Sequence, residues 1–266
     1  MIDNPRSPRV RGVAKLAKRD ARSETGLFLL EGPQAVSEAL AYRPELLVEL
    51  FVTPTALERY PEVGRAAKAA DLEVEFVTEQ VLEAMADTVT PQGIVAVCRQ
   101  FPTSLKDILG AGPKLVAVLE EVRDPGNAGT IIRAADSAGA DAVILTGRSV
   151  DLYNPKVVRA TTGSLFHVSV AVVPELDAVL QKLKAAGLQV LAADIKGEDL
   201  LVARNGGVLA KPTAWLFGNE ARGLDDEQLA LADRAITVPI YGKAESMNLA
   251  TAASVCLYES AFAQRS

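Results

Sequence analysis

Three polar stretches of this chain each follow an apolar run and carry side chains that could do chemistry. Residues 120–140 read EEVRDPGNAGTIIRAADSAGA, residues 216–224 read LFGNEARGL, and residues 238–259 read VPIYGKAESMNLATAASVCLYE. Ligands of open α/β sheets bind beyond the carboxyl ends of parallel strands. Three such junctions therefore predict one shared ligand pocket.

The first stretch supplies an asparagine and an arginine. Asn127 is placed to cap a helix that begins at Ala128 or Gly129, and Arg133 lies at the second turn of that helix. The neighbours of Arg133 are small or apolar. We therefore expect its guanidinium to be buried or to face a cleft, where it needs an anionic partner or a ligand.

The other two stretches add a carboxylate, a hydroxyl and an amide. Gly218 would let the backbone approach a ligand closely, and Glu220 could bind a cation or orient a polar group. Ser246 and Asn248 could simply cap the helix that follows them. The density of polar residues over 242–248 favours a further role for them in the site.

The sequence lacks the motifs that several other activities require. No GxGxxG or GxxxxGK[ST] follows any expected strand, which argues against a nucleotide-binding oxidoreductase. Cys98 and Cys256 lie in apolar runs outside any CxxC pair, so we expect two small buried side chains and neither a disulfide nor a metal site. The one histidine, His167, is expected to be structural.

The larger apolar side chains have no evident chemical role. Met85 and Met247 are expected to fill space, and Trp215 to lie in the core.

Apolar periodicity predicts alternating strands and helices over two regions, which is typical of α/β domains. Residues 1–100 form a small α/β unit, residues 101–113 a linker with one short helix, and residues 114–266 a domain whose aliphatic strands indicate a parallel sheet covered on both faces. The expected helices cover 8–24, 33–42, 55–70, 78–88, 127–139, 154–164, 175–187 and 248–264, and the expected strands cover 28–30, 46–53, 72–78, 93–100, 115–121, 142–147, 168–173, 188–194, 213–218 and 235–240.

Charge is distributed unevenly along the chain. The net charge is −6, yet residues 1–23 form a basic arm that could contact phosphates. The alternative is a solvated, partly helical terminus. The basic residues of this arm are Arg6, Arg9, Arg11, Lys15, Lys18, Arg19 and Arg22.

Two further features concern location. No apolar run is long enough to span a bilayer, and the N-terminus lacks the apolar segment of a secretory signal. A cytoplasmic location is expected.

The three polar motifs together resemble a known family. Asn127 with Arg133, then Gly218-x-Glu220-x-x-Gly223-Leu224, then Ser246-Met247-Asn248-Leu249, are similar in order and spacing to the motifs of the SpoU (TrmH-like) RNA ribose 2′-O-methyltransferases of the SPOUT superfamily. The likeness covers residues 114–266. Residues 8–100 resemble, less specifically, the ribosomal-protein-like RNA-binding domain that often precedes this catalytic domain. Tyr241 and its neighbours depart from the Met-x-Gly pattern usual in the third motif.

This resemblance implies a fold, a cofactor and an assembly. The C-terminal sheet domain would contain a deep trefoil knot, bind S-adenosyl-L-methionine without a metal, and form a homodimer through the catalytic domain. The reaction would transfer a methyl group to a ribose 2′-hydroxyl of RNA. By position, the cofactor would contact Thr146, Gly147, Leu216, Phe217, Gly218, Ile240 and Leu249.

The same resemblance assigns catalytic roles to Asn127, Arg133, Glu220, Ser246 and Asn248. It gives removal of the hydroxyl proton to the residue matching Arg133. A guanidinium does not deprotonate in proteins, so we expect Arg133 instead to hold the adjacent phosphate and stabilise the developing alkoxide. Asn127, Ser246 and Asn248 would fix the ribose and Arg133, and Glu220 would orient Arg133 or its loop.

The substrate is left open by these arguments. Ribosomal RNA of the 23S type is expected, as a housekeeping methylation or as resistance to an antibiotic. Transfer RNA is the alternative substrate, and a non-catalytic RNA-binding or ribosome-assembly protein on the same fold is the alternative class.

Overall fold

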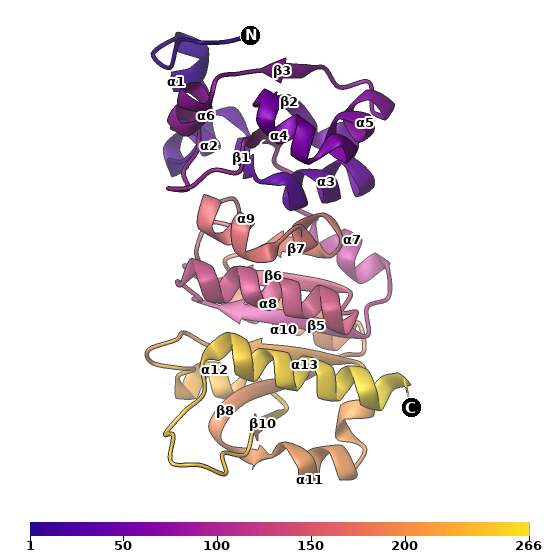
Figure 1. The fold of residues 1–266 in the computed structure, drawn as a ribbon. Coiled ribbons are helices and arrows are strands. Elements are labelled where there is room, and N and C mark those ends of the chain that lie inside the picture. The colour runs from indigo at the N-terminus through magenta and orange to yellow at the C-terminus, as the bar shows by residue number, and fades with distance from the viewer. Residues whose placement is uncertain (266) are drawn as a thin grey trace. The chain divides into compact units, whose positions relative to one another are not determined.

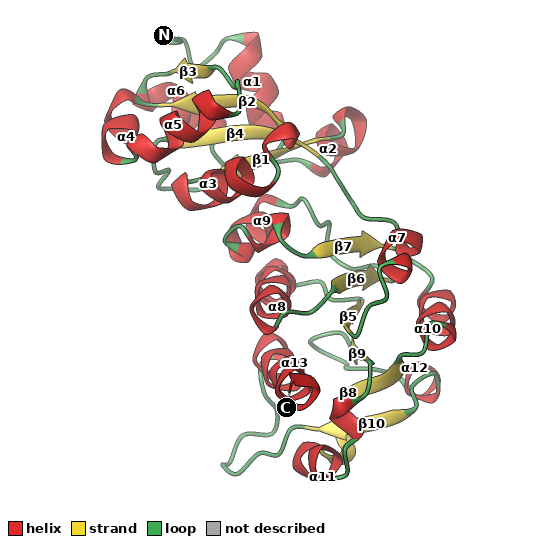
Figure 2. Ribbon diagram, turned by 90° about the vertical axis from the view of Figure 1, so that its right-hand side faces the viewer, coloured by secondary structure: helices red, strands yellow, loops and turns green. Residues whose placement is uncertain are grey.

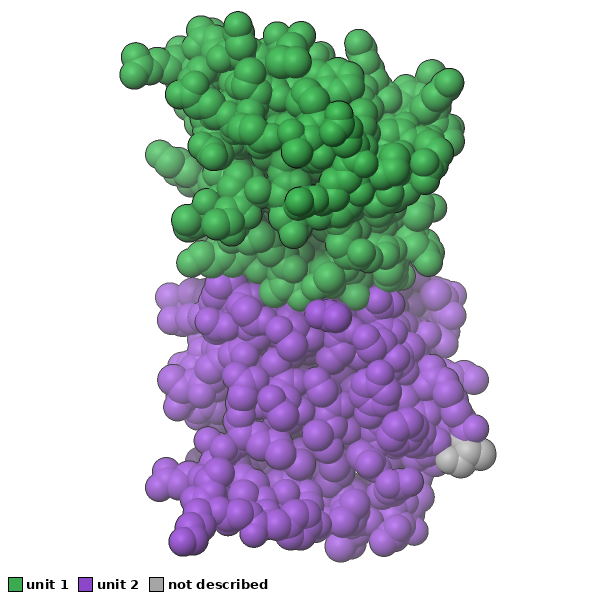
Figure 3. All heavy atoms as spheres, viewed as in Figure 1, with its two compact units in different colours: residues 1–101, 151–167 green, residues 102–150, 168–266 purple. Residues whose placement is uncertain are grey.

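The computed structural model describes residues 1–265 and contains two compact units (Figure 3). Unit 1 combines Met1–Phe101 with Asp151–His167, and unit 2 combines Pro102–Val150 with the chain from Val168 onward. The segment 151–167 thus packs with unit 1, although its sequence lies among the strands of unit 2. The predicted limits at 1–100, 101–113 and 114–266 stay a prediction.

Unit 1 is a mixed four-stranded sheet in the order β1-β4-β2-β3, in which β4 is antiparallel to β1 and β2, and β2 is parallel to β3 (Figure 1). The small N-terminal α/β unit is confirmed. Its elements are α1 (Pro8–Lys15), α2 (Arg19–Thr25), β1 (Leu27–Glu31), α3 (Pro33–Tyr42), η1 (Pro44–Leu46), β2 (Leu47–Val52), α4 (Pro54–Arg59), α5 (Pro61–Ala69), β3 (Val74–Phe76), α6 (Glu79–Met85), β4 (Ile94–Arg99), α9 (Pro155–Thr161) and η2 (Ser164–Phe166).

The basic N-terminal segment is folded into unit 1. It forms two helices instead of the single one expected over 8–24, because Lys18 is extended between them. Val10, Val13 and Leu16 are buried in a cluster with residues of α6 and the sheet. These three side chains anchor the segment 1–23 to the core of unit 1, so it is not a free arm.

Unit 2 is a six-stranded, wholly parallel sheet in the order β10-β8-β9-β5-β6-β7. Helices α8 and α13 cover one face and α10 and α12 the other, as the sequence predicted for near-continuous aliphatic strands (Figure 2). Its elements are α7 (Leu105–Gly110), β5 (Leu115–Glu120), α8 (Pro125–Ala138), β6 (Ala142–Thr146), β7 (Ser169–Val172), α10 (Leu176–Ala185), β8 (Gln189–Asp199), α11 (Leu200–Asn205), η3 (Val208–Ala210), β9 (Thr213–Phe217), α12 (Asp226–Ala230), β10 (Arg234–Thr237) and α13 (Leu249–Arg265).

Strand β8 and the short helices differ most from expectation. β8 continues to Asp199 instead of ending at Asp194, and its polar extension pairs with β10 after a shift in register. Helices α11 and α12 were not expected at all. Each has only five or six residues, and α12 is held by a capping box between Asp225 and Gln228.

Most of the apolar side chains that were expected to be buried are buried. Cys98, Cys256, Trp215 and Met85 are buried, and the Trp215 indole donates to Ser260 Oγ at 2.9 Å. Met247 is the exception, because its side chain is 39% exposed instead of filling space.

Candidate functional site

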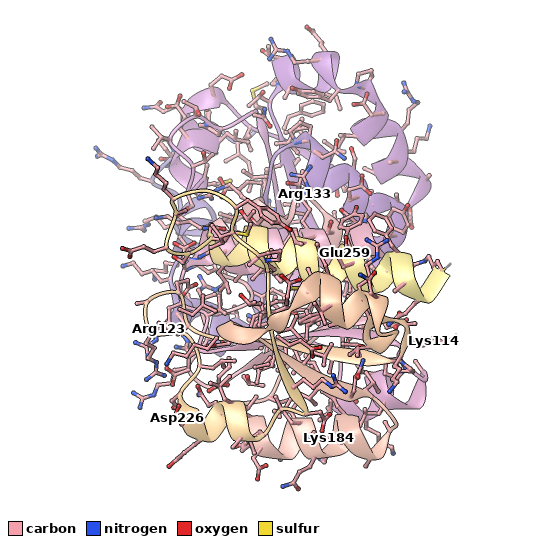
Figure 4. The ribbon with its side chains drawn as sticks, turned by 90° about the horizontal axis from the view of Figure 1, so that it is seen from below. Lys114, Arg123, Arg133, Lys184, Asp226 and Glu259 are labelled. Atoms are coloured by element: carbon pink, nitrogen blue, oxygen red, sulfur yellow. The ribbon has the colours of Figure 1, made fainter. Side chains whose placement is uncertain are left out.

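The three polar motifs converge at the carboxyl ends of the parallel strands of unit 2. Lys114, before β5, and Arg123, after it, lie at opposite ends of the sheet, and the motifs lie at the Arg123 end (Figure 4). A cavity of about 330 Å³ opens there. It is lined by Ala193, Asp194, Ile195, Asn219, Glu220, Ala221, Arg222, Gly223, Ile236, Thr237, Val238, Ile240, Ser246, Met247, Leu249 and Ala252.

Helix α8 begins at Pro125, three or four residues before the start at Ala128 or Gly129 that the sequence suggested. Pro125 is its first residue, and Asp124 is its N-cap, accepting from the Asn127 backbone N–H at 2.7 Å. The prediction that Asn127 caps this helix is therefore wrong. Its side chain is left available for the site, since the capping bond is made by Asp124.

Glu220 holds the loop that leads into α8. Its Oε1 accepts from the Asp124 backbone N–H at 3.0 Å, and its Oε2 accepts from the Arg123 backbone N–H at 3.2 Å. The Asn127 side-chain amide also approaches Oε1, at 3.4 Å. The carboxylate thus joins the second motif to the first.

Asn248 extends this network to the third motif. Its side-chain amide donates to Asn127 Oδ1 at 3.0 Å, while its own Oδ1 accepts from the Thr251 backbone N–H at 3.2 Å, near the start of α13. Asn248 therefore caps α13, as considered from the sequence, and also bonds to a residue of the first motif, while its role in a site stays a prediction. Asn248, Asn127 and Glu220 form one hydrogen-bonded chain beside the cavity, and Ser246 lines the cavity itself.

A second set of charged side chains lies next to the hydrogen-bonded series of Asn248, Asn127 and Glu220. Glu121 pairs with Arg123 at 3.1 Å and also with Arg222. Its backbone has a positive φ of 50°, and its carbonyl accepts from the Asn219 side chain at 2.8 Å. These contacts fix the turn after β5 against the turn after β9.

Glu120 is a buried carboxylate that the sequence reasoning missed. Its side chain accepts from Thr146 Oγ1 at 2.6 Å and from Gln228 Nε2 at 3.1 Å. Desolvation raises the pKa of Glu120, and the Thr146 hydrogen bond lowers it by less. The signal was present in the sequence, since Glu120 ends an apolar strand.

Arg133 lies apart from the cavity. It is exposed on α8, so the expectation of burial is wrong, and it does not line the cavity. Six residues separate it from Asn127, which is about 9 Å along a helix and a different side of it. Arg133 shares its side of α8 with Ser137, whose backbone carbonyl accepts from the Tyr258 hydroxyl of α13 at 3.2 Å.

The seven cofactor candidates fall into two groups. Ile240 and Leu249 line the cavity, whereas Thr146, Gly147, Leu216, Phe217 and Gly218 are not part of its lining. The close approach at Gly218 is to the protein's own backbone, since a Cβ there would lie 2.6 Å from the Gly223 carbonyl carbon.

The sequence analysis did not predict that residues at the end of β8 and in β10 line the cavity. The sequence did carry a signal for it, because the expected strand 188–194 ends in Asp194.

The basic residues of the N-terminus differ in exposure. Arg22 is 2% exposed and donates to Asp151 Oδ2 and to the carbonyls of Leu16 and Ala17, so it stabilises unit 1 and cannot contact RNA. Arg9 pairs with Glu49 and Glu75. The remaining exposed basic residues are Arg6, Arg11, Lys15, Lys18 and Arg19.

Two kinds of feature are absent from the described residues, 1–265. No group of three or more His, Cys, Asp or Glu residues could hold a metal ion there. No helix in this range is long and apolar enough to cross a membrane. His167 contacts Glu38 at 3.0 Å and the Tyr42 ring, in keeping with the structural role expected for it.

Comparison with known proteins covers nearly the whole chain. The model of the SpoU rRNA methylase family matches residues 114–258, and a model described as RNA 2′-O ribose methyltransferase substrate binding matches residues 29–104. The chain is 34% identical over 263 residues to the 23S rRNA (guanosine(2553)-2′-O)-methyltransferase RlmP of Bacillus subtilis, covering 97% of each protein.

Two solved structures are similar along the same length. The AdoMet-bound rRNA methyltransferase from Sinorhizobium meliloti has a TM-score of 0.82 at 31% identity, covering 97% of this chain and 96% of that one. The SpoU methyltransferase AviRb from Streptomyces viridochromogenes, in complex with AdoMet, has a TM-score of 0.82 at 28% identity, covering 97% and 99%.

Proposed function

The chain belongs to the SpoU rRNA methylase family, and from this premise we propose that it methylates a ribose 2′-hydroxyl of 23S-type ribosomal RNA. It is an RNA 2′-O-methyltransferase, and its cofactor is S-adenosylmethionine. The observation that carries the proposal is the hydrogen-bonded chain of Asn248, Asn127 and Glu220, which joins all three motifs beside one cavity.

The cavity fits this cofactor. Its volume of about 330 Å³ is in the range of small-molecule sites. Ile195, Ile240 and Leu249 would contact the adenosine, and the carboxylate of Asp194 would favour the positively charged part. When bound, S-adenosylmethionine supplies an electrophilic methyl group on a sulfonium.

The side chains beside the cavity have separate tasks in this proposal. Asn127 and Asn248 hold the ribose, and Ser246 positions it from the cavity wall. Glu220 orients the loop before α8, since both its oxygens already accept from that loop. Because Arg133 lies on a different side of α8 from Asn127, we assign the adjacent phosphate, and the negative charge that develops on the 2′-oxygen, to Arg133 of a second copy.

We propose a homodimer through α8 and α13. Tyr258 and Phe262 are exposed on α13, and their rings lie 5.6 Å apart. Apolar surface of this kind is typical of interfaces. Arg133 lies on the same side of α8 as Ser137, which contacts Tyr258. Pairing across this face would bring Arg133 to the interface, toward the cavity of a second copy.

Two further features rest on the family alone. The trefoil knot expected in the C-terminal domain stays a prediction. A cytoplasmic location is proposed from the substrate, because ribosomal RNA is bound in ribosomes there.

Methyl transfer tests the proposal directly. Purified protein and labelled S-adenosylmethionine would be incubated with 23S rRNA from cells that lack this gene, and the modified nucleotide mapped. We expect one 2′-O-methylated position, with transfer lost in Ser246→Ala. Labelling of a base, or of transfer RNA alone, would contradict the proposal.

A further inference from the structure

Tyr241 is unusually exposed for an aromatic side chain. Its exposed fraction is 84%, against 59% for Tyr42 and 54% for Phe262. The chain has only seven Phe, five Tyr and one Trp. A large ring in water contributes little to folding, so another explanation for Tyr241 is needed.

The neighbours of Tyr241 in the sequence show where it lies. Ile240, directly before it, and Ser246 and Met247, a few residues after it, all line the cavity. The loop 241–245 therefore leaves the cavity edge and returns to it. Its far end is anchored, because Asn248 bonds to Asn127 at 3.0 Å. Tyr241 thus directly follows a residue of the cavity lining, in a loop whose two ends both reach the cavity.

The rim has the character of a surface for RNA bases. Ile195 and Met247, which line the cavity, are also exposed, and Lys243 adds an exposed positive charge two residues beyond Tyr241. Unpaired bases of RNA stack on aromatic side chains, and their phosphates bind cations. A ribose held by Asn127 and Asn248 would place its own base or a neighbouring one within reach of this rim.

We propose that Tyr241 stacks on a nucleobase of the RNA substrate at the rim of the cavity. The proposal rests on the methyltransferase function proposed above. It makes Tyr241 a residue that binds substrate RNA, distinct from those that bind cofactor or hold the ribose. Because any base offers a flat face, Tyr241 would select for an unpaired base more than for its identity.

Steady-state kinetics would test this stacking with three variants. Tyr241→Ala removes the ring, Tyr241→Phe keeps it without the hydroxyl, and Val202→Ala truncates another exposed apolar side chain, on α11, outside the cavity lining. We expect Tyr241→Ala to raise the KM for RNA about tenfold, the size of one lost base–aromatic contact. Tyr241→Phe and Val202→Ala should stay near the wild-type value.

Two further measurements separate stacking from other roles. Calorimetry should show the same affinity of wild type and Tyr241→Ala for S-adenosylmethionine. RNA carrying 2-aminopurine at or next to the methylated nucleotide should lose fluorescence on binding wild type, and less on binding Tyr241→Ala.

Each contrary outcome has a distinct meaning. An unchanged KM for RNA in Tyr241→Ala, beside an active wild type, would overturn the stacking proposal alone. A matching loss of cofactor affinity would overturn it too, by showing that Tyr241 covers the cofactor. Absence of methyl transfer by the wild type would instead contradict the function itself.

Discussion

Arg133 and Glu220 carry opposite charges in the same set of motifs, but they have different surroundings. The Glu220 carboxylate accepts from the backbone of Arg123 and Asp124, so its position is set by the fold. Arg133 is exposed on another side of α8 and outside the cavity lining. A side chain outside the cavity lining does not contact a cofactor bound there, so we expect Arg133 to act on the RNA and not on cofactor binding.

Substitution of Arg133 should therefore separate catalysis from cofactor binding. Arg133→Ala should lower kcat at least a hundredfold, a range typical of lost transition-state stabilisation, with cofactor affinity unchanged by calorimetry. Arg133→Lys should also fail, because an ammonium does not replace the planar guanidinium fork. A Lys variant with near-normal kcat would show that charge alone is sufficient.

At the scale of elements, the turn after β9 depends on a backbone contact. A Cβ on Gly218 would lie 2.6 Å from the carbonyl carbon of Gly223, where the turn 219–223 closes on itself. Gly218→Val should displace this turn from the cavity wall and weaken S-adenosylmethionine binding at least tenfold by calorimetry. Gly242→Ala is the matched control, because a Cβ there meets nothing within 4 Å. Equal binding by both variants would place the cofactor elsewhere.

Glu120 joins the ends of β5 and β6 to α12 through its bonds with Thr146 and Gln228. Desolvation raises its pKa in the folded state above the ordinary value of 4.5. The stability linked to this group is thus fully present below the unfolded-state pKa and is lost as pH rises through the folded-state pKa.

Unfolding of wild type and Glu120→Gln should therefore depend differently on pH. Wild type should lose stability relative to Glu120→Gln as pH rises from about 4.5, the ordinary pKa, toward neutrality. Chemical denaturation at several pH values would measure this difference. A difference that is constant with pH would mean that Glu120 titrates normally.

Local patterns in the sequence predicted the elements better than the contacts between them. Aliphatic runs predicted the parallel sheet of unit 2, because strands covered on both faces exclude polar residues. The start of α8 was misplaced because Asp124 and Asn127 can both cap a helix, although Pro125 favours the earlier start. Burial of Arg22 depends on Asp151, 129 residues away, which no local pattern reveals.

For the whole molecule, assembly is the first property to measure. We expect light scattering at micromolar concentration to give the mass of two chains. Phe262→Glu should shift the mass toward one chain, because a charge would be buried at the proposed α8–α13 interface. The substitution Leu201→Glu, on α11, is a control at another exposed apolar side chain. A monomeric wild type would contradict the dimer.

We expect unit 1 to bind RNA through charges carried by a folded surface. Deleting residues 1–23 would remove Val10, Val13 and Leu16 from the core, so loss of binding in that variant would have two explanations. Neutral substitution of the exposed basic residues alone avoids this, and the set is Arg6, Arg11, Lys15, Lys18 and Arg19 changed to Gln.

This neutralised variant should bind RNA more weakly and with a flatter dependence on salt. Each lost phosphate contact lowers the slope of log K against log salt by about 0.7 to 0.9. Cofactor affinity should be unchanged, since the cavity lies in unit 2. Arg65→Gln with Lys68→Gln, both exposed on α5, is the matched control for loss of charge elsewhere in unit 1. If the neutralised variant kept the wild-type salt slope, α1 and α2 would only support the fold, and RNA would have to bind another surface.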